Sequence, residues 1–175
     1  MDGLRGAPAV LKEVWEAGFR YVSSKAWGPD WTLPALLHNP FTYAEDGFPD
    51  LWELPCSGWH DNVLKFGMGN QPVRLIAFPA PYPEAVPLKP IETPEEEIAI
   101  NRAFIDRALA GSYTHLSLVW HPRSITRFDP DMKMLVETFR YAQSVGMQFA
   151  TYEQLWKMMI KQQTPSTEQQ GNYSS

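Results

Sequence analysis

The chain has 175 residues, of which 44% are hydrophobic and 20% are charged, and its net charge is −5. This composition is typical of one globular domain with its own core. An acidic balance without a basic stripe argues against a nucleic-acid partner, and no apolar run approaches the roughly 20 residues that span a bilayer.

The first residues, MDGLRGAP, contain no apolar signal segment, so the chain as written is expected to be cytoplasmic, unless a signal lies upstream. Cys56 is the single cysteine, which excludes an internal disulfide and a cysteine-rich metal site. We interpret it as a small buried thiol rather than a nucleophile.

The first expected element is a helix over residues 8–17, because Pro8 suits a first helical position and Gly18 the position after the last. A strand is expected over 19–24. Residues 25–50 show no clear period. A loop of that length in a compact domain usually covers a site.

Strands are then expected over 51–55 and 73–79, followed by a stiff proline-rich connection. Thr93 is expected to cap a helix that runs to residue 111, with Glu96 completing a capping box. Glu95, Glu96 and Glu97 are interpreted as a solvated first turn that favours the helix dipole and has no catalytic role.

The last third alternates between strand and helix. A strand is expected over 115–120, a helix capped by Asp129 over 130–145, a strand over 147–151 and a helix over 152–163. This order predicts an α/β fold with a largely parallel sheet, open or closed as a barrel. Residues 1–162 would form one domain, and the polar residues 163–175 a disordered tail.

His121 is the strongest candidate for catalysis, because it follows a predicted strand and functional sites gather at the carboxyl ends of parallel strands. Its ring titrates near neutrality, which suits a general acid or base. The alternative is a hydrogen-bonded structural histidine. His115 begins the same strand, roughly 20 Å away if extended, so the two cannot share a metal. The histidines form no local metal motif.

Weaker candidates for ligand binding lie in or next to the predicted loops. Trp59, His60 and Asp61 place two rings and a carboxylate together, where they could bind a ligand or cap a turn. Trp27 and Trp31 could stack on a sugar ring. Arg5 could hold a carboxylate through two parallel hydrogen bonds, or be a solvated charge.

Four phrases in order, LRGAPAVLKEVWEAGFRYVSS, LWELP, LSLVWHP and MQFATYEQLW, resemble the second half of the polysaccharide deacetylase (NodB-homology) family. The resemblance covers roughly residues 3–160. It implies an incomplete, distorted (β/α) barrel and a metal-dependent hydrolase that removes N- or O-linked acetyl groups from carbohydrate.

The resemblance also implies roles for individual residues. His121 matches the histidine that protonates the leaving group, and Leu118 matches the leucine of the same motif. Arg5 matches the arginine that orients the catalytic base, although LRGAPA departs from the usual R-x-P-x-G. Trp27, Trp31 or Trp59 would shape the acetyl pocket.

The family's early motifs, which carry the base and the ligands of a divalent metal (often zinc), have no counterpart in this chain. We therefore expect the chain alone to bind no metal, to be inactive, and to self-associate through an exposed barrel edge. Two other functions stay open. One is hydrolysis of C–N bonds in small cyclic amides on the same fold, and the other is non-catalytic carbohydrate binding.

Overall fold

A computed structural model shows how these segments fold. Two sequence predictions, the strand over 73–79 and the site residue Trp31, lie outside the described residues, as does nearly all of the predicted tail. The described residues are 3–28, 33–66, 82–87 and 90–163.

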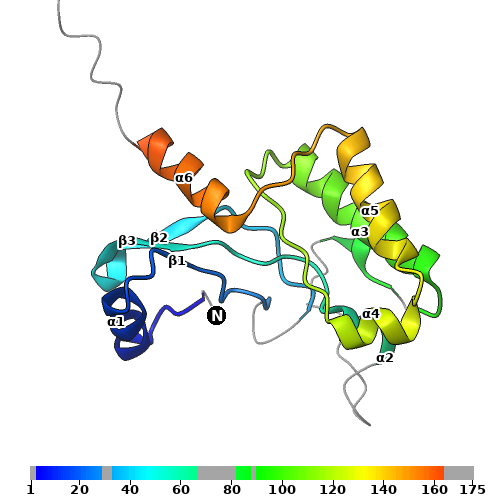
Figure 1. Ribbon diagram of the computed structural model, residues 1–175, viewed down its shortest axis with the longest axis horizontal. Helices are drawn as coiled ribbons and strands as arrows, with labels where there is room; N and C mark the ends of the chain where they lie inside the picture. Colours follow the sequence, from blue (N-terminus) through cyan, green and yellow to red (C-terminus); the bar gives the residue numbers. More distant parts are fainter. Residues whose placement is uncertain (1–2, 29–32, 67–81, 88–89, 164–175) are drawn as a thin grey trace, which may run out of the picture.

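A small mixed sheet forms one side of the molecule (Figure 1). Its strands are β1 (Tyr21–Val22), β2 (Phe41–Tyr43) and β3 (Phe48–Glu53), in the order β1-β3-β2. β1 is parallel to β3, whereas β2 is antiparallel to it. The prediction of one long loop over 25–50 is wrong, since β2 and the start of β3 lie within it.

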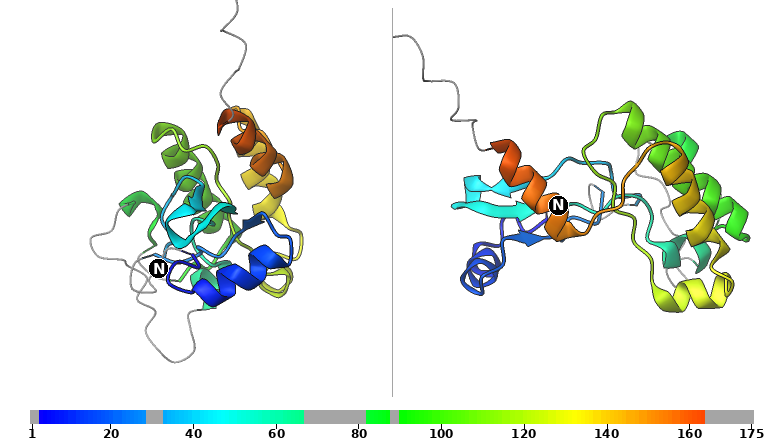
Figure 2. Two further views of the ribbon diagram at one scale, coloured as in Figure 1. Left: turned by 90° about the vertical axis from the view of Figure 1, so that its left-hand side faces the viewer. Right: turned by 45° about the horizontal axis from the view of Figure 1, so that its top comes forward.

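Two helices cover the two faces of this sheet, because successive side chains of β3 point in opposite directions. Leu51 packs with Leu11 of α1 (Pro8–Glu16) on one face. Trp52 and Leu54 pack with α6 (Tyr152–Gln163) on the other face. Leu51 and Leu54 are fully buried, and each contributes about 1.5–3 kcal/mol through removal from water. Figure 2 shows α1 and α6 beside the strands.

Most of the remaining helices among the described residues lie at the other end of the molecule (Figure 2). Asn101 of α3 donates to Thr138 of α5 at 3.3 Å, which links the two longest helices there. The helices of this region are α2 (Asp61–Phe66), α3 (Pro94–Ala110), α4 (Pro122–Phe128) and α5 (Lys133–Ser144). The described residues also include the short 3-10 turns η2 (Ala44–Asp46) and η3 (Pro83–Ala85).

The predicted capping box of α3 is confirmed. The Glu96 amide donates to the Thr93 hydroxyl at 3.3 Å, and the Thr93 amide donates to the Glu96 carboxylate at 3.0 Å. Two of the amides at the helix start are thus satisfied reciprocally. The helix ends at Ala110, one residue before the predicted end.

Two predicted strands are wrong. Residues 115–120 and 147–151 form no strand, because a strand requires a partner along its length, and the first segment has a single bridge, from Val119 to His60. At the end of the second segment, Thr151 instead begins α6, where its hydroxyl accepts from the Gln154 amide at 3.2 Å. The apolar side chains of both segments pack against other parts of the molecule, but their backbones do not pair in a β-ladder.

The helix predicted over 130–145 begins later, at Lys133. The sequence did not predict α4, and Asp129 is the residue that follows its last turn. Asp129 also caps the next helix, although it lies four residues before the first residue of that helix. Its carboxylate accepts from the Met134 amide at 2.6 Å. The capping residue was therefore identified correctly, but the helix start that it serves was placed three residues too early.

The mixed α/β class is confirmed, while a barrel is not shown by the described residues. The sheet has one parallel and one antiparallel pairing, so the prediction of largely parallel strands is too strong. Among the described ranges, no helix has both the length and the apolar character needed to cross a membrane.

Candidate functional site

Two extended segments run in parallel at the centre of the molecule and end beside each other. The first continues beyond β3, where the Ser57 amide donates to the Ser117 carbonyl at 2.8 Å. A parallel bridge then joins His60 to Val119. Because the segments share a direction, the residues that follow them, Asp61 and His121, meet at the same end.

Gly58 makes this approach possible. Its φ angle is +89°, and a Cβ there would lie 3.0 Å from the Leu118 side chain. A larger residue would be strained in its backbone, and the Leu118 side chain would have to shift to make room for it. Leu118, the motif leucine that the family resemblance places at the substrate site, is half-buried and packs against the core that contains Phe104.

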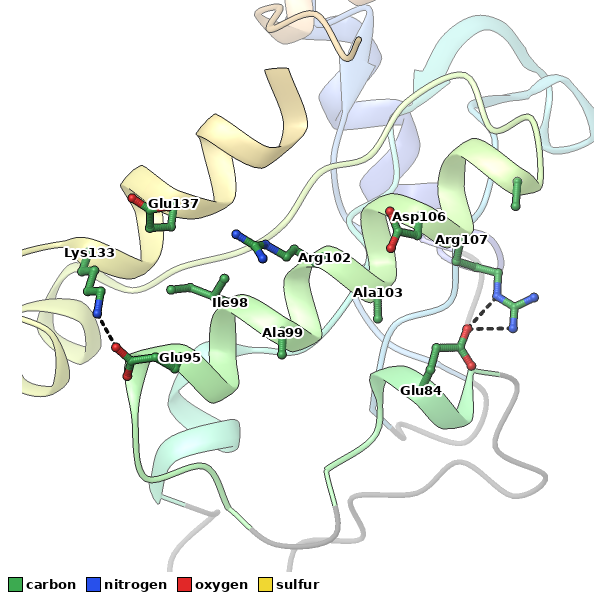
Figure 3. A pocket seen from close by; sticks show the side chains of 11 residues that line it. Glu84, Glu95, Ile98, Ala99, Arg102, Ala103, Asp106, Arg107, Lys133 and Glu137 are labelled. Atoms are coloured by element: carbon green, nitrogen blue, oxygen red, sulfur yellow. Dashed lines mark hydrogen bonds and ion pairs between the residues drawn. The ribbon is translucent and has the colours of Figure 1, made fainter. Parts of the chain in front are cut away.

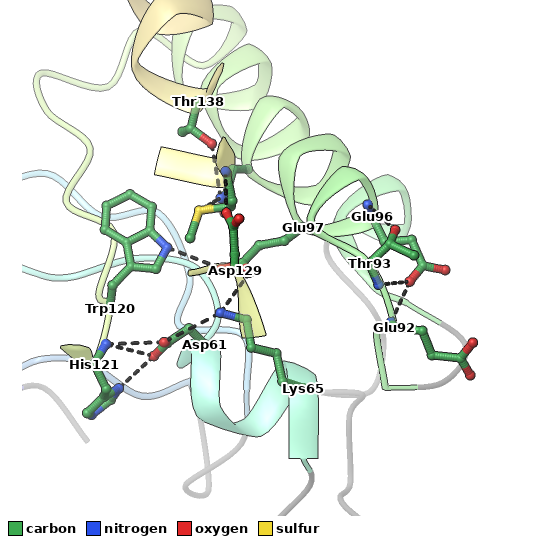
Figure 4. Close-up of polar contacts among 12 residues, drawn as sticks. Asp61, Lys65, Glu92, Thr93, Glu96, Glu97, Trp120, His121, Asp129 and Thr138 are labelled. Atoms are coloured by element: carbon green, nitrogen blue, oxygen red, sulfur yellow. Dashed lines mark hydrogen bonds and ion pairs between the residues drawn. The ribbon is translucent and has the colours of Figure 1, made fainter. Parts of the chain in front are cut away.

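Asp61 and His121 form the central contact of the site (Figure 4). The His121 Nδ1 lies 2.6 Å from Asp61 Oδ1, and the His121 backbone amide donates to both carboxylate oxygens at 3.1 Å. Since an ionised carboxylate only accepts hydrogen bonds, Nδ1 carries the proton, and Nε2 remains available for proton transfer. The side chain of His121 is 47% exposed, whereas that of Asp61 is 1% exposed.

His60 and Trp27 stand beside this pair. The ring centroids of His60 and His121 are 6.4 Å apart, and those of His60 and Trp27 are 4.5 Å apart in an edge-to-face arrangement. His60 Nε2 donates to the Ala26 carbonyl at 2.9 Å. Burial lowers the pKa of His60 below its usual value, and the neighbouring His121 acts in the same direction. His60 therefore presents a neutral ring next to His121.

A buried ion pair lies behind Asp61, and the sequence analysis missed it. Lys65, one helical turn after Asp61, places its ammonium 3.7 Å from Asp61 Oδ2 and 2.8 Å from Glu97 Oε2. The side chains of Lys65 and Glu97 are 0% and 1% exposed. Burial raises the pKa of Glu97, and Lys65 opposes that effect. The interpretation of Glu97 as a solvated charge is therefore wrong.

A sequence signal for this pair existed. Asp61 and Lys65 are spaced four residues apart, which puts them on one face of a helix. Glu97 lies three residues before Ile100 and seven before Phe104, which places all three on the apolar face of α3. A charge on an apolar face needs a buried partner.

The structure does not bring the other candidates to His121. Arg5 forms an ion pair with Glu45 and lies 5.1 Å over the Phe41 ring, on the outside of the sheet. Trp59 is 5% exposed and its indole donates to the Ala85 carbonyl at 2.7 Å, so it is a core residue.

His115 lies at the other end of the segment from His121, as predicted. Its Nε2 donates to the Pro55 carbonyl at 2.9 Å, while its Nδ1 is buried without a partner among the described residues. Burial lowers the pKa of His115. Cys56 is half-buried, with its sulfur 3.2 Å from the Ser23 hydroxyl and 3.7 Å from the Tyr152 hydroxyl. These contacts join the segments that follow β1 and β3 to Tyr152, the first residue of α6.

Two cavities lie outside this site. A groove of about 770 Å³ runs along α3, and its charged residues are paired at both ends, Glu84 with Arg107 and Glu95 with Lys133 (Figure 3). A second cavity, of about 530 Å³, lies between α3, α5 and the start of α6. Leu118 and Trp120 line this second cavity, but His121 lines neither.

Comparison with known proteins gives no relative. No protein-family model, no curated protein and no solved structure matches the chain.

Proposed function

We propose that this chain contributes the proton-transfer part of a hydrolase site that removes acetyl groups from carbohydrate. The observation that carries the proposal is the His121–Asp61 contact of 2.6 Å, with one partner buried and the other half exposed. A buried carboxylate that fixes one ring nitrogen while the other faces solvent is the arrangement used in general acid–base catalysis.

The proposed step uses His121 as an acid. Protonated Nε2 gives its proton to the leaving amine or alkoxide as the bond to the acetyl carbon breaks, and the ring is left neutral with its proton on Nδ1. Asp61 keeps the ring in one orientation and stabilises the imidazolium before the transfer. Trp27, which packs beside His60, supplies an aromatic face near the reaction centre.

A divalent metal is not assigned to the described residues. Within those ranges, no three histidine, cysteine, aspartate or glutamate side chains come together as ligands. The described residues therefore do not supply the ligands of the metal site that the family resemblance implies.

We also propose that the fold is an incomplete, distorted (β/α) barrel. It is supported by the parallel pairing of β1 with β3 and by the parallel bridge between His60 and Val119. Self-association belongs to the same proposal. Phe139, Phe149 and Met158 are 40–55% exposed around the second cavity, and large exposed apolar side chains favour contact between chains.

Acetate release tests the proposal. The protein purified from its native source is assayed on N-acetylated and O-acetylated oligosaccharides, and His121→Gln is introduced into its gene. Release should fall by about 10²–10⁴-fold, because the leaving group loses its proton donor. His38→Gln is the matched control, since His38 is exposed and bonds the Asn39 carbonyl, and it should release acetate at the wild-type rate. The isolated 175-residue chain should be inactive.

Acetate release that is absent from the native protein, or equal in wild type and His121→Gln, would overturn the proposal. Release of an amine or acid from a small cyclic amide would then favour the C–N hydrolase. Quenching of tryptophan fluorescence by an oligosaccharide, without turnover, would favour a binding protein.

A further inference from the structure

The three glutamates that begin α3 have different environments. Glu95 is exposed and forms an ion pair with Lys133. Glu96 closes the capping box with Thr93. Glu97 points inward and meets the buried ammonium of Lys65. Only the third glutamate thus carries its charge into the interior, next to the proposed site.

Two chains of contacts connect Glu97 to His121, one through Lys65 and Asp61 and the other through Trp120 (Figure 4). Lys65 lies between Glu97, at 2.8 Å, and Asp61, at 3.7 Å. The other oxygen of Glu97 accepts from the Trp120 indole at 3.2 Å. Trp120 directly precedes His121, whose ring and backbone amide both bond Asp61. Both the ring and the backbone of His121 are therefore tied to the same buried charges.

Stability alone does not account for this ion pair. Burying an ammonium and a carboxylate costs several kcal/mol per ion, and apolar residues of similar volume often serve equally well. The ring of Phe128 lies 4.8 Å from the ammonium and shields it further.

We infer that Glu97 is a positioning residue that holds the Lys65 ammonium away from Asp61, so that Asp61 stays available to His121. Lys65 is shared by two carboxylates and stands about an ångström closer to Glu97. Asp61 can then direct Oδ1 to the His121 ring and both oxygens to its backbone amide. This inference rests on the proposed function for its catalytic meaning, but its geometry can be tested without activity.

The test is Glu97→Gln in the full chain, read by nitrogen-15 NMR of the His121 ring at a pH where the ring is neutral. The amide keeps the shape of Glu97 and an acceptor for Trp120 but removes the charge. Lys65 should then move to Asp61 and compete with the His121 ring. The Nδ1-protonated form should fall from nearly all of the neutral ring toward the mixture that an unconstrained imidazole shows.

A double variant separates positioning from folding. Lys65→Met combined with Glu97→Gln removes the competitor as well as the residue that holds it, so the Nδ1-protonated form should return to the wild-type fraction. Glu95→Gln, which removes an exposed charge from the same first turn of α3, should leave it unchanged. If Glu97→Gln does not fold, Glu97→Asp retains the charge with a shorter reach and should give an intermediate fraction.

In the native protein, Glu97→Gln should lower kcat for acetate release by about 10- to 100-fold with KM unchanged, because the proton donor is misplaced rather than lost. An unchanged ring in Glu97→Gln, or no recovery in the double variant, would overturn the inference whatever the activity. Acetate release that does not depend on His121 would overturn the proposed function and leave the ring measurement standing.

Discussion

Two carboxylates are fully buried at opposite ends of one extended run of chain, and they have different partners. Glu53, at the end of β3, accepts from the amides of Ser24 and Lys25 at 2.7 and 2.8 Å and from the hydroxyls of Ser24 and Tyr43 at 2.6 and 2.5 Å. Asp61 accepts from the ring and the amide of His121, and it faces Lys65.

The difference separates a carboxylate that joins parts of the fold from one that lies in the proposed site. The donors of Glu53 come from β2 and the segment after β1, and the Tyr43 hydroxyl in turn accepts from the Leu4 amide at 2.8 Å, so the group ties the N-terminal segment to the sheet. Burial and the contact with Glu53 raise the pKa of Tyr43 far above its usual value. The partner of Asp61 instead reaches solvent and can exchange a proton.

Asp61→Asn should have the largest effect. An amide presents an acceptor and a donor, so the ring of His121 is no longer fixed in one form, and acetate release should fall by about 10²–10⁴-fold. The assay is the rate of acetate release per folded molecule in the native protein. A rate within threefold of wild type would contradict a functional role for Asp61, since about 0.6 kcal/mol is too little for a lost orienting group.

Glu53→Gln should have the opposite pattern. The amide nitrogen would face donors instead of accepting from them, which should lower the free energy of unfolding by about 1–3 kcal/mol. Urea unfolding followed by tryptophan fluorescence measures this loss. The rate per folded molecule should not change, and a selective loss of rate would place Glu53 in the functional site.

Tyr43→Phe should cost less than Glu53→Gln, because it removes one donor to Glu53 and one acceptor from Leu4 while keeping the ring. The expected loss is about 1–2 kcal/mol in the free energy of unfolding. The Leu4 amide should also exchange its hydrogen faster, since that bond is made to the Tyr43 hydroxyl. Unchanged protection of Leu4 would show that Glu53 and Tyr43 do not hold the N-terminal segment.

His115 should produce a smaller, pH-dependent effect. Its folded-state pKa lies below the usual 6.5 because of burial, and a second proton would occupy the buried Nδ1 that has no partner among the described residues. The unfolded chain therefore binds a proton first, so stability is complete above pH 6.5 and is lost as the pH falls toward the lowered value. Urea midpoints measured across that range should decline less in His115→Gln than in wild type.

The sequence was informative where a local rule determines the structure. The capping box of Thr93 and Glu96 and the start of α1 at Pro8 follow from neighbouring residues, and the structure confirms both. His121 was placed correctly at the end of an extended segment, although that segment is not a strand.

The rest depended on contacts between distant residues. Strand propensity in residues 115–120 could not reveal that a ladder partner is lacking along most of the segment. The pairing of Asp61 with His121 spans 60 residues, and that of Lys65 with Glu97 spans 32. Asp61 was predicted to bind a ligand or to cap a turn, and the sequence did not indicate that its carboxylate is buried against His121.

The state of the His121 ring tests the central claim most directly. Nitrogen-15 NMR of the full chain, with His121→Gln to assign the signals, shows which ring nitrogen carries the proton when the ring is neutral. The account predicts that Nδ1 is protonated in nearly all molecules and that Nε2 has a free lone pair. A ring protonated mainly at Nε2, as an unconstrained histidine is, would contradict the claim that Asp61 prepares His121 for proton transfer.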